Sequence, residues 1–228
     1  NYKIQDVPLS KFDKTEYGLS SKVISELKFI KESNTSQLIV VTSKISNSSN
    51  VVINTYEKNK NGWVNIHKNI TGWIGLKGFT TNKKEGDSKT PVGAFNIGTC
   101  FGKDTNFDTG LDYYRYDSKD VWVDDPNSKL YNTHQREPSN GRWKSAVNFS
   151  KNTDGIYDLF FTIGYNQQNI KNKGSAIFFR IIKPNMVIKY TNGAVAAERK
   201  DVTSIAKWLD KNKSPKILMG PLSEIINY

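Results

Sequence analysis

Cysteine and histidine, which together form a common nucleophile and general-base pair, are scarce in this chain of 228 residues, which contains one cysteine and two histidines. Cys100 has no base beside it in the sequence, so we interpret it as a small buried residue. His67 and His134 stand in unlike surroundings, and neither belongs to a cluster with metal-ligand spacing. The sequence therefore predicts no cysteine–histidine pair, no metal site and no cofactor.

A glycine turn near the C-terminal end is the first pattern with chemical meaning. Residues 191–196 read Thr-Asn-Gly-Ala-Val-Ala. Gly193 permits a backbone conformation that is open mainly to glycine, and successive amides in such a turn can point at one oxyanion. Thr191 can order the turn through its hydroxyl, and Asn192 lies within it. Ala194 offers only a methyl group, so the turn itself contains no nucleophile.

The segment 174–182 predicts a strand with an unusual arginine. Alternation places Arg180 on the same face as the apolar residues Ala176 and Phe178. Because an unpaired buried guanidinium is costly, Arg180 should reach solvent, a carboxylate or a cleft. Arginine stays protonated and is no general base, but its fixed charge can hold a substrate carboxylate or lower the pKa of a nearby thiol. An arginine that reaches water from a strand end is the simpler alternative.

Three segments, taken together and in order, resemble the L,D-transpeptidase family of bacterial cell-wall enzymes. They are 84–93 (Lys-Glu-Gly-Asp-Ser-Lys-Thr-Pro-Val-Gly), 174–180 (Gly-Ser-Ala-Ile-Phe-Phe-Arg) and the turn at 191–196, and Trp-Val-Asp-Asp-Pro-Asn-Ser-Lys-Leu-Tyr-Asn-Thr at 122–133 is similar to the family as well. The resemblance extends from residue 37 to residue 220. It does not include the first 36 residues.

The resemblance implies a reaction whose two main side chains are missing here. In the family, position 194 holds a cysteine and position 180 a histidine that takes the proton from its thiol, but this chain has Ala194 and Arg180. The family's cysteine attacks the carbonyl of the third residue of a peptidoglycan stem peptide, expels the terminal D-alanine and forms a thioester that an amine or water resolves. By resemblance, the catalytic positions are Thr191, Asn192, Gly193, Ala194 and Arg180.

We therefore interpret the chain as a pseudoenzyme of this transferase family, inactive as written, that binds peptidoglycan. Two alternatives stay open. In the first alternative, Ala194 is an engineered replacement in a working L,D-transpeptidase or carboxypeptidase. In the second, the chain is an interaction protein of another class that uses the same fold. Loss of both catalytic side chains favours the natural pseudoenzyme, since an experimenter who disables an enzyme usually changes one residue.

The irregular region between residues 102 and 150 is rich in aromatic and charged side chains. Aromatic faces stack on sugars or peptides while Arg and Asp orient them, so the region is suited to the wall of a groove for a polar polymer. Small satellite cores under long loops explain the same pattern equally well. The candidate substrate-binding residues are Trp122, Tyr131, Trp143 and, outside this region, Ser175.

The charge balance favours anionic partners. Lys and Arg number 33 against 22 Asp and Glu, a formal charge of +11. The lysines are dispersed and no nucleic-acid fingerprint is present, so we expect a peptidoglycan stem peptide or another cell-wall polymer as partner rather than nucleic acid. A solvated basic surface that maintains solubility accounts for the same charge. Nothing in the sequence fixes the oligomeric state.

No apolar run has the length of a membrane span, and residues 1–20 lack the order of a signal peptide. The single cysteine does not decide the compartment. The family resemblance implies an extracellular or cell-wall location.

The elements that must position these residues are mostly strands. Short runs of β-type residues alternate with Gly, Asn, Asp and Ser. We expect a mainly β fold, an L,D-transpeptidase-like β-sandwich of mixed sheets with a few peripheral helices. Residues 37–228 are expected to form this domain and residues 1–36 an N-terminal segment. Apolar stripes at helical spacing predict helices at 21–32 and 201–211.

Overall fold

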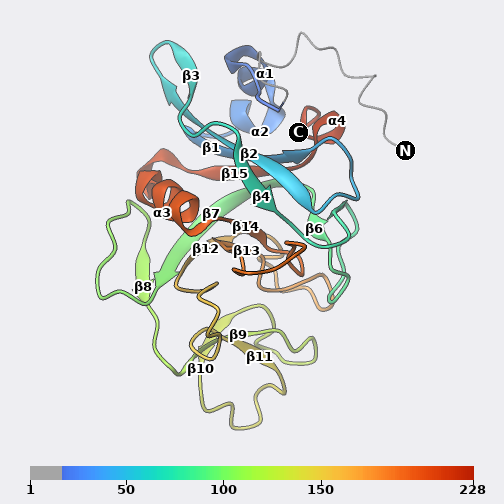
Figure 1. Cartoon of the computed structure of the whole chain (residues 1–228), viewed down its shortest axis with the longest axis vertical. Helices are drawn as coiled ribbons and strands as arrows, with labels where there is room; N and C mark the ends of the chain where they lie inside the picture. The colour runs from blue at the N-terminus through green and yellow to red at the C-terminus, as the bar shows by residue number, and fades with distance from the viewer. Residues whose placement is uncertain (1–16) are drawn as a thin grey trace.

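Eight strands pair in a ring that forms the centre of the protein (Figure 1). In the computed structural model, which describes residues 17–228, the ring follows the order β1-β15-β7-β12-β13-β14-β4-β2, and β2 pairs back to β1. These strands are β1 (Gln37–Ser43), β2 (Asn50–Asn59), β4 (Ile70–Trp73), β7 (Gly93–Gly102), β12 (Leu159–Ile163), β13 (Phe178–Ile181), β14 (Val195–Ala197) and β15 (Lys216–Pro221). The predicted mainly β fold with mixed pairing is confirmed, because β1–β15 and β13–β14 are parallel and the other pairings in the ring antiparallel.

Smaller strands extend the ring or lie beside it. β3 (Gly62–Asn65) pairs with β2, β8 (Tyr113–Arg115) pairs with β7, and β5 (Phe79–Thr80) pairs with β6 (Thr90–Pro91). A separate three-stranded sheet contains β9 (Asp120–Val123), β10 (His134–Arg136) and β11 (Ala146–Asn148). This sheet lies at the end of the molecule opposite α1 and α2 (Figure 1).

The first strand of the ring, β1, is buried along its whole length. In β1, Ile39 and Val41 belong to the main core inside the ring, whereas Leu38 and Val40 belong to a second cluster beneath the helices. Side chains alternate along a strand, so the two clusters lie on opposite faces of β1. Burial on both faces explains why this strand is a continuous apolar run.

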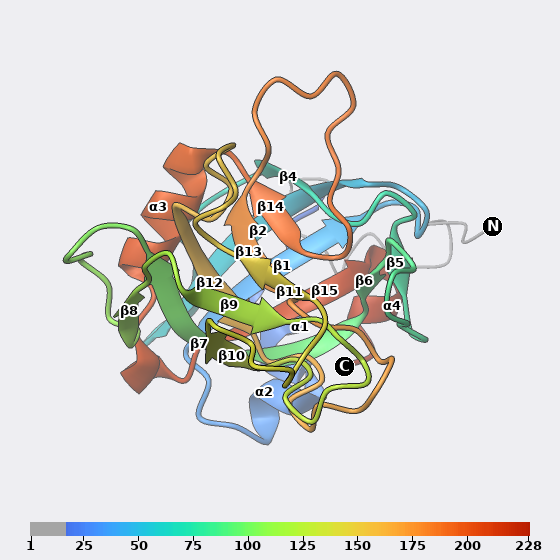
Figure 2. The same ribbon diagram turned by 90° about the horizontal axis from the view of Figure 1, so that it is seen from below.

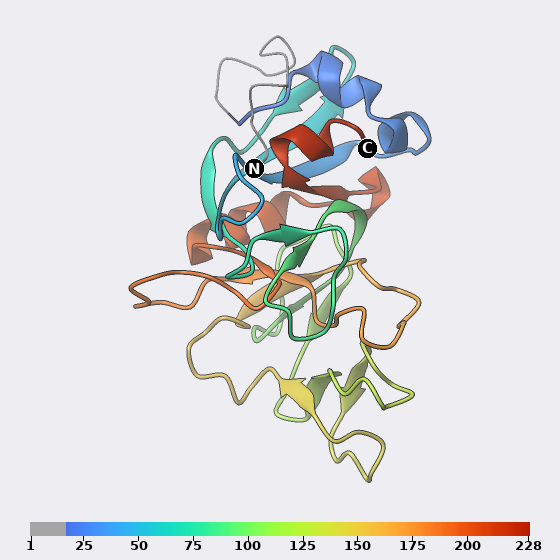
Figure 3. The same cartoon turned by 90° about the vertical axis from the view of Figure 1, so that its right-hand side faces the viewer.

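The helix predicted at 21–32 is observed as two short helices, α1 (Ser21–Glu26) and α2 (Lys28–Lys31). Ser20 begins α1 by accepting a hydrogen bond from the amide of Val23 at 3.2 Å. Leu27 separates the helices with an extended backbone and is buried. Both helices pack on the ring in the second cluster, beside the C-terminal helix α4 (Leu222–Ile225), as Figure 3 shows. The division at residue 36 stays a prediction, and residues 1–16 of the expected segment lie outside the described residues.

The helix predicted at 201–211 is observed as α3 (Arg199–Trp208), followed by a 3-10 turn at Lys211–Lys213. Leu209 has an extended backbone and ends the helix earlier than predicted. The apolar stripe of α3 is buried in the main core. No helix within residues 17–228 has the length and apolar character needed to cross a membrane.

The docking of α1 is testable because Ile24 is fully buried. We expect Ile24→Ala to lower the free energy of unfolding by about 2–4 kcal/mol, the usual cost of emptying a buried aliphatic site. The exposed neighbour Glu26 is the matched control, and Glu26→Ala should change the value by less than about 0.5 kcal/mol. Urea denaturation measures both, and equal small effects would show that α1 does not stabilise the ring.

Candidate functional site

The glycine turn before β14 is held by the hydroxyl of Thr191. This hydroxyl accepts a hydrogen bond from the amide of Gly193 at 3.1 Å and donates one to the carbonyl of Ala194 at 2.6 Å. Gly193 has φ 141°, in the region that favours glycine, and a Cβ there would lie 2.9 Å from the carbonyl oxygen of Lys89. Thr191 is buried and Asn192 is exposed. The hydrogen bonds of Thr191 and the close approach of Lys89 therefore fix the backbone conformation of the turn.

A second threonine ties this turn to the segment 84–93. The hydroxyl of Thr90 donates to the carbonyl of Gly193 at 2.8 Å and accepts from the amide of Gly75 at 2.9 Å. Gly75 in turn forms a β-bridge with Thr191. Segments far apart in the sequence, which carry the motifs noted above, thus meet at one place.

Arg180 lies on the strand beside the turn. It pairs in register with Ala196 of β14, and alternation places Ala194 on the same face as Ala196. Arg180 is 9% exposed and Ala194 8%. The structure therefore brings together the two positions that the resemblance assigns to base and nucleophile.

The guanidinium of Arg180 has few partners. One Nη donates to the carbonyl of Ile181 at 2.7 Å, and the group lies 6.0 Å from the ring centre of Tyr157. No ion pair within residues 17–228 involves Arg180. Burial lowers the pKa of Arg180 and raises that of Tyr157. Asp124 also raises the Tyr157 pKa, and its Oδ1 is buried without a hydrogen bond.

Glu85 joins two of the residues predicted to bind substrate. Ser175 Oγ donates to Glu85 Oε2 at 2.8 Å, and the hydroxyl of Tyr131 donates to the same oxygen. The amide of Gly174 donates to the Tyr131 hydroxyl at 3.0 Å. Burial and the Glu85 carboxylate raise the pKa of Tyr131, which stays protonated. Both predicted side chains are therefore engaged within the protein.

Trp122 lies beside the Arg180 strand. Its indole donates to Asn132 Oδ1 at 2.9 Å, and its ring meets that of Phe178 at 5.0 Å. The same Asn132 oxygen accepts from the amide of Ala176 at 3.1 Å. Ala176 has a left-handed backbone with φ 53°, which explains why β13 begins at Phe178 and not at residue 174 as predicted.

Trp143 lies apart from these residues. It is 6% exposed and packs with Val121 and Val123 of the small three-stranded sheet. The guanidinium of Arg142 lies 4.5 Å from its ring centre. Trp143 thus occupies one of the satellite cores that the sequence allowed, and a role in binding stays a prediction.

The two histidines and the single cysteine have their contacts away from the turn. His134 bonds to the buried Asp120 at 2.8 Å, and His67 contacts the hydroxyl of Ser204 at 3.0 Å. Burial raises the pKa of Cys100 to about 12. Its predicted burial is confirmed. Residues 17–228 contain no group of three or more His, Cys, Asp or Glu side chains arranged to hold a metal ion.

Lys83 is a buried residue of this region that sequence analysis did not single out. It is 4% exposed, and its ammonium lies 2.6 Å from Asp87 Oδ1 and 2.7 Å from the carbonyl of Lys84. Its chain crowds the space that a side chain at Gly174 would need, since a Cβ there would lie 3.1 Å from Lys83 Cγ, and it lies near Gly193, where a Cβ would be 3.5 Å from Lys83 Cε. The only signal in the sequence was its position next to the segment 84–93.

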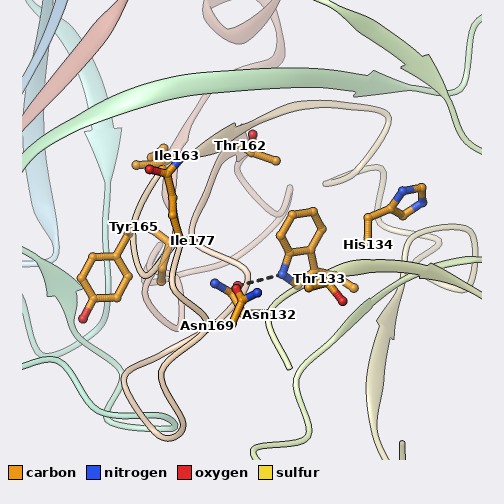
Figure 4. A pocket seen from close by; sticks show the side chains of 11 residues that line it. Asn132, Thr133, His134, Thr162, Ile163, Tyr165, Asn169 and Ile177 are labelled. Atoms are coloured by element: carbon orange, nitrogen blue, oxygen red, sulfur yellow. Dashed lines mark hydrogen bonds between the residues drawn. The ribbon is translucent and has the colours of Figure 1, made fainter. Parts of the chain in front are cut away.

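Three cavities in the described part of the chain are lined by residues near these segments, and none of the three is lined by residues 191–196. One of about 370 Å³ is lined by Trp122, Asn132 and Ile177, with His134 and Tyr165 at its two ends (Figure 4). A second of about 360 Å³ lies between Trp73 and residues 186–189, and a third of about 430 Å³ lies between residues 82–85 and 171–173.

The fold and site define a mainly β domain with a glycine turn beside a buried arginine, and comparisons with known proteins add little to that description. No protein-family model matches the chain, and no curated protein matches it in sequence. Among solved structures, the helical cell shape determining protein Pgp2 from Campylobacter jejuni is similar with a TM-score of 0.40 and 16% identity. The match covers 81% of this chain and 47% of that one, so the chain spans about half of its length. A likeness this distant supports no conclusion about activity.

The ion pair of Lys83 makes the site sensitive to acid. Asp87→Asn leaves the buried ammonium without its counter-charge, so we expect a loss of about 3 kcal/mol in the free energy of unfolding at neutral pH. Burial opposes ionisation of Asp87, but hydrogen bonds from Lys83 and from the amides of Lys84 and Lys89 outweigh it, and the pKa of Asp87 is lowered.

A depressed carboxyl pKa contributes stability that is present above the unfolded pKa, about 4, and is lost as the pH falls through the folded value. The difference between the wild type and Asp87→Asn should therefore narrow in urea denaturation series carried from neutral pH to below about pH 4. A difference that is the same across this range would rule out the ion pair as its source.

Proposed function

We propose that this chain is a cell-wall peptide-binding domain of L,D-transpeptidase-like architecture that lacks the covalent step. Its ligand is the stem peptide of peptidoglycan. The main support is the turn at 191–194, in which the hydrogen bonds of Thr191 and Thr90 fix the backbone while the methyl of Ala194 stands where the resemblance expects a thiol. A structured turn without a nucleophile is suited to binding and not to acyl transfer.

Other side chains do not replace the missing pair. The Cys100 thiol is buried on β7 with a pKa raised to about 12, so it is not a thiolate at neutral pH. Ser175 donates its hydroxyl hydrogen to Glu85, and the two histidines bond to groups away from the turn. Arg180 occupies the base position and does not accept a proton. These contacts favour an inactive domain over an enzyme that lacks only its cysteine.

Arg180 is the residue that we assign to the ligand. It has a fixed charge, retains slight exposure on the face of Ala194 and has no ion pair within residues 17–228. A carboxylate at its exposed edge forms a charge-assisted hydrogen bond and offsets part of the cost of burying the cation. The C-terminal carboxylate of a stem peptide meets this requirement.

The cavity at Trp73 is suited to the body of the peptide. Ala196 pairs with Arg180 on one side and with Trp73 on the other, so these two side chains lie roughly 10 Å apart, about three residues of extended chain. Met186, Val187 and Ile188 form the opposite wall, in a loop that projects from the ring (Figure 2). Lys189 also lines this cavity, with its ammonium 4.7 Å from the ring centre of Trp73. A peptide held at its carboxylate by Arg180 therefore reaches a surface with an apolar wall and a cation beside Trp73.

The test is calorimetric titration with a tetrapeptide stem and with the same peptide as its C-terminal amide. The wild type should bind the acid about tenfold more tightly than the amide, because the amide loses the charge-assisted contact. Arg180→Gln should bind both peptides equally, and Arg180→Lys should retain part of the preference. Thermal unfolding of each variant verifies that it is folded. A preference for the acid that survives in folded Arg180→Gln would show that another residue holds the carboxylate.

A further inference from the structure

A strongly basic cavity lies between the loop at residues 82–85 and the loop at 171–173. The two loops are joined by a hydrogen bond from the amide of Glu85 to the carbonyl of Asn172, at 2.9 Å. The volume of about 430 Å³ is ample for one or more phosphate groups with their surrounding water. This cavity is separate from the face that carries Ala194 and Arg180.

The charges that line the cavity are almost all positive. Four of its residues are lysines, Lys83, Lys84, Lys171 and Lys173, and one is Glu85. The carboxylate of Glu85 accepts hydrogen bonds from Tyr131 and Ser175, and the ammonium of Lys83 is neutralised by Asp87. Tyr131 and Ser175 are neutral, so Glu85 keeps its negative charge, and with Lys83 paired to Asp87 the lining keeps three positive charges and one negative charge.

These three lysines form no ion pair within the described part of the chain, although Glu85 lines the same cavity and Lys171 interacts electrostatically with Asp125. Lys171 donates to the neutral amide oxygen of Asn127 at 2.6 Å, and no ion pair there involves Lys84, Lys171 or Lys173. The side-chain amides of Asn82 and Asn172 add neutral donors to the same lining. Like charges held in one cavity repel each other, and an anion bound among them relieves that repulsion.

We propose that this cavity binds phosphate groups of a phosphate-bearing polyanion. Lysine binds phosphate as a point charge, and several lysines around one cavity suit the diffuse charge of its oxygens. The formal charge of +11 attracts such a polymer from a distance, and the cavity gives it a defined place to bind. The proposal does not depend on the stem-peptide function, because none of its residues belongs to the face of Arg180.

Lys83 places this cavity next to the glycine turn. Lys83 is one of the residues that line the cavity, and its aliphatic chain packs against Gly174 and approaches Gly193. A polyanion bound here therefore lies beside the turn without covering Ala194. The chain then has adjacent surfaces for a peptide and for a phosphate polymer.

The experiment compares two double variants of equal charge. Lys84→Gln/Lys173→Gln removes two charges from the cavity, and Lys58→Gln/Lys60→Gln removes two from exposed positions at the β2–β3 hairpin. Each protein is titrated at physiological salt with inorganic phosphate and with a poly(glycerol phosphate) chain, by amide chemical-shift perturbation and by calorimetry. We expect the cavity variant to bind the polymer about tenfold more weakly and the hairpin variant less than about twofold.

The two probes distinguish the sources of the phosphate. Shifts at the amides of Lys84 and Lys173 with both probes indicate a site for single phosphates, and shifts with the polymer alone indicate a polymer site. Equal weakening in both double variants would overturn the proposal, because net charge alone would then explain binding. Absence of binding by the wild type with either probe would overturn it as well. Neither result bears on the binding of the stem peptide at Arg180.

Discussion

The hydroxyl of Thr90 makes the interaction on which the rest of the site depends. It donates to the carbonyl of Gly193 and accepts from the amide of Gly75, so one side chain links two turns that lie 118 residues apart in the sequence. The hydroxyl of Thr191 completes the arrangement from within the turn. Both threonines are buried, and loss of either hydroxyl would leave buried backbone groups without a partner. These hydrogen bonds hold the backbone of the turn in place although Ala194 has no reactive side chain for the turn to position.

The ring explains why these contacts occur together. β13 and β14 are adjacent and parallel, so Arg180 lies on the same face as Ala196, and alternation places Ala194 on that face as well. Arg180 is 9% exposed, and its guanidinium donates one hydrogen bond, to the carbonyl of Ile181. A buried cation without a carboxylate lowers stability unless a ligand compensates it. This energetic cost is the physical basis for assigning Arg180 to an anionic ligand group.

Local patterns allowed the sequence to predict the elements but not their closure. The apolar spacing at residues 23–30 and the β-type runs separated by Gly, Asn, Asp and Ser each depend on near neighbours. They predicted the mainly β class and a single helix at 21–32, where the structure has α1 and α2. The ring depends on pairings such as β1 with β15, which join residues nearly 180 positions apart and leave no periodic signal. Lys83 was missed for the same reason, because only the folded chain brings it against Gly174 and Gly193. The predicted strand is interrupted at Ala176, whose amide donates a hydrogen bond to Asn132. This long-range contact is not visible in the local sequence pattern.

The most direct measurement is the restoration of the thiol. Ala194→Cys is incubated with a tetrapeptide stem, and release of D-alanine and formation of a thioester are followed by mass spectrometry, with binding of the peptide measured in the same sample. A domain without a catalytic base is predicted to bind the peptide and to release no D-alanine, because Arg180 does not take the proton from the new thiol. Turnover by this single variant would contradict the account and identify the chain as an enzyme that lacks only its nucleophile.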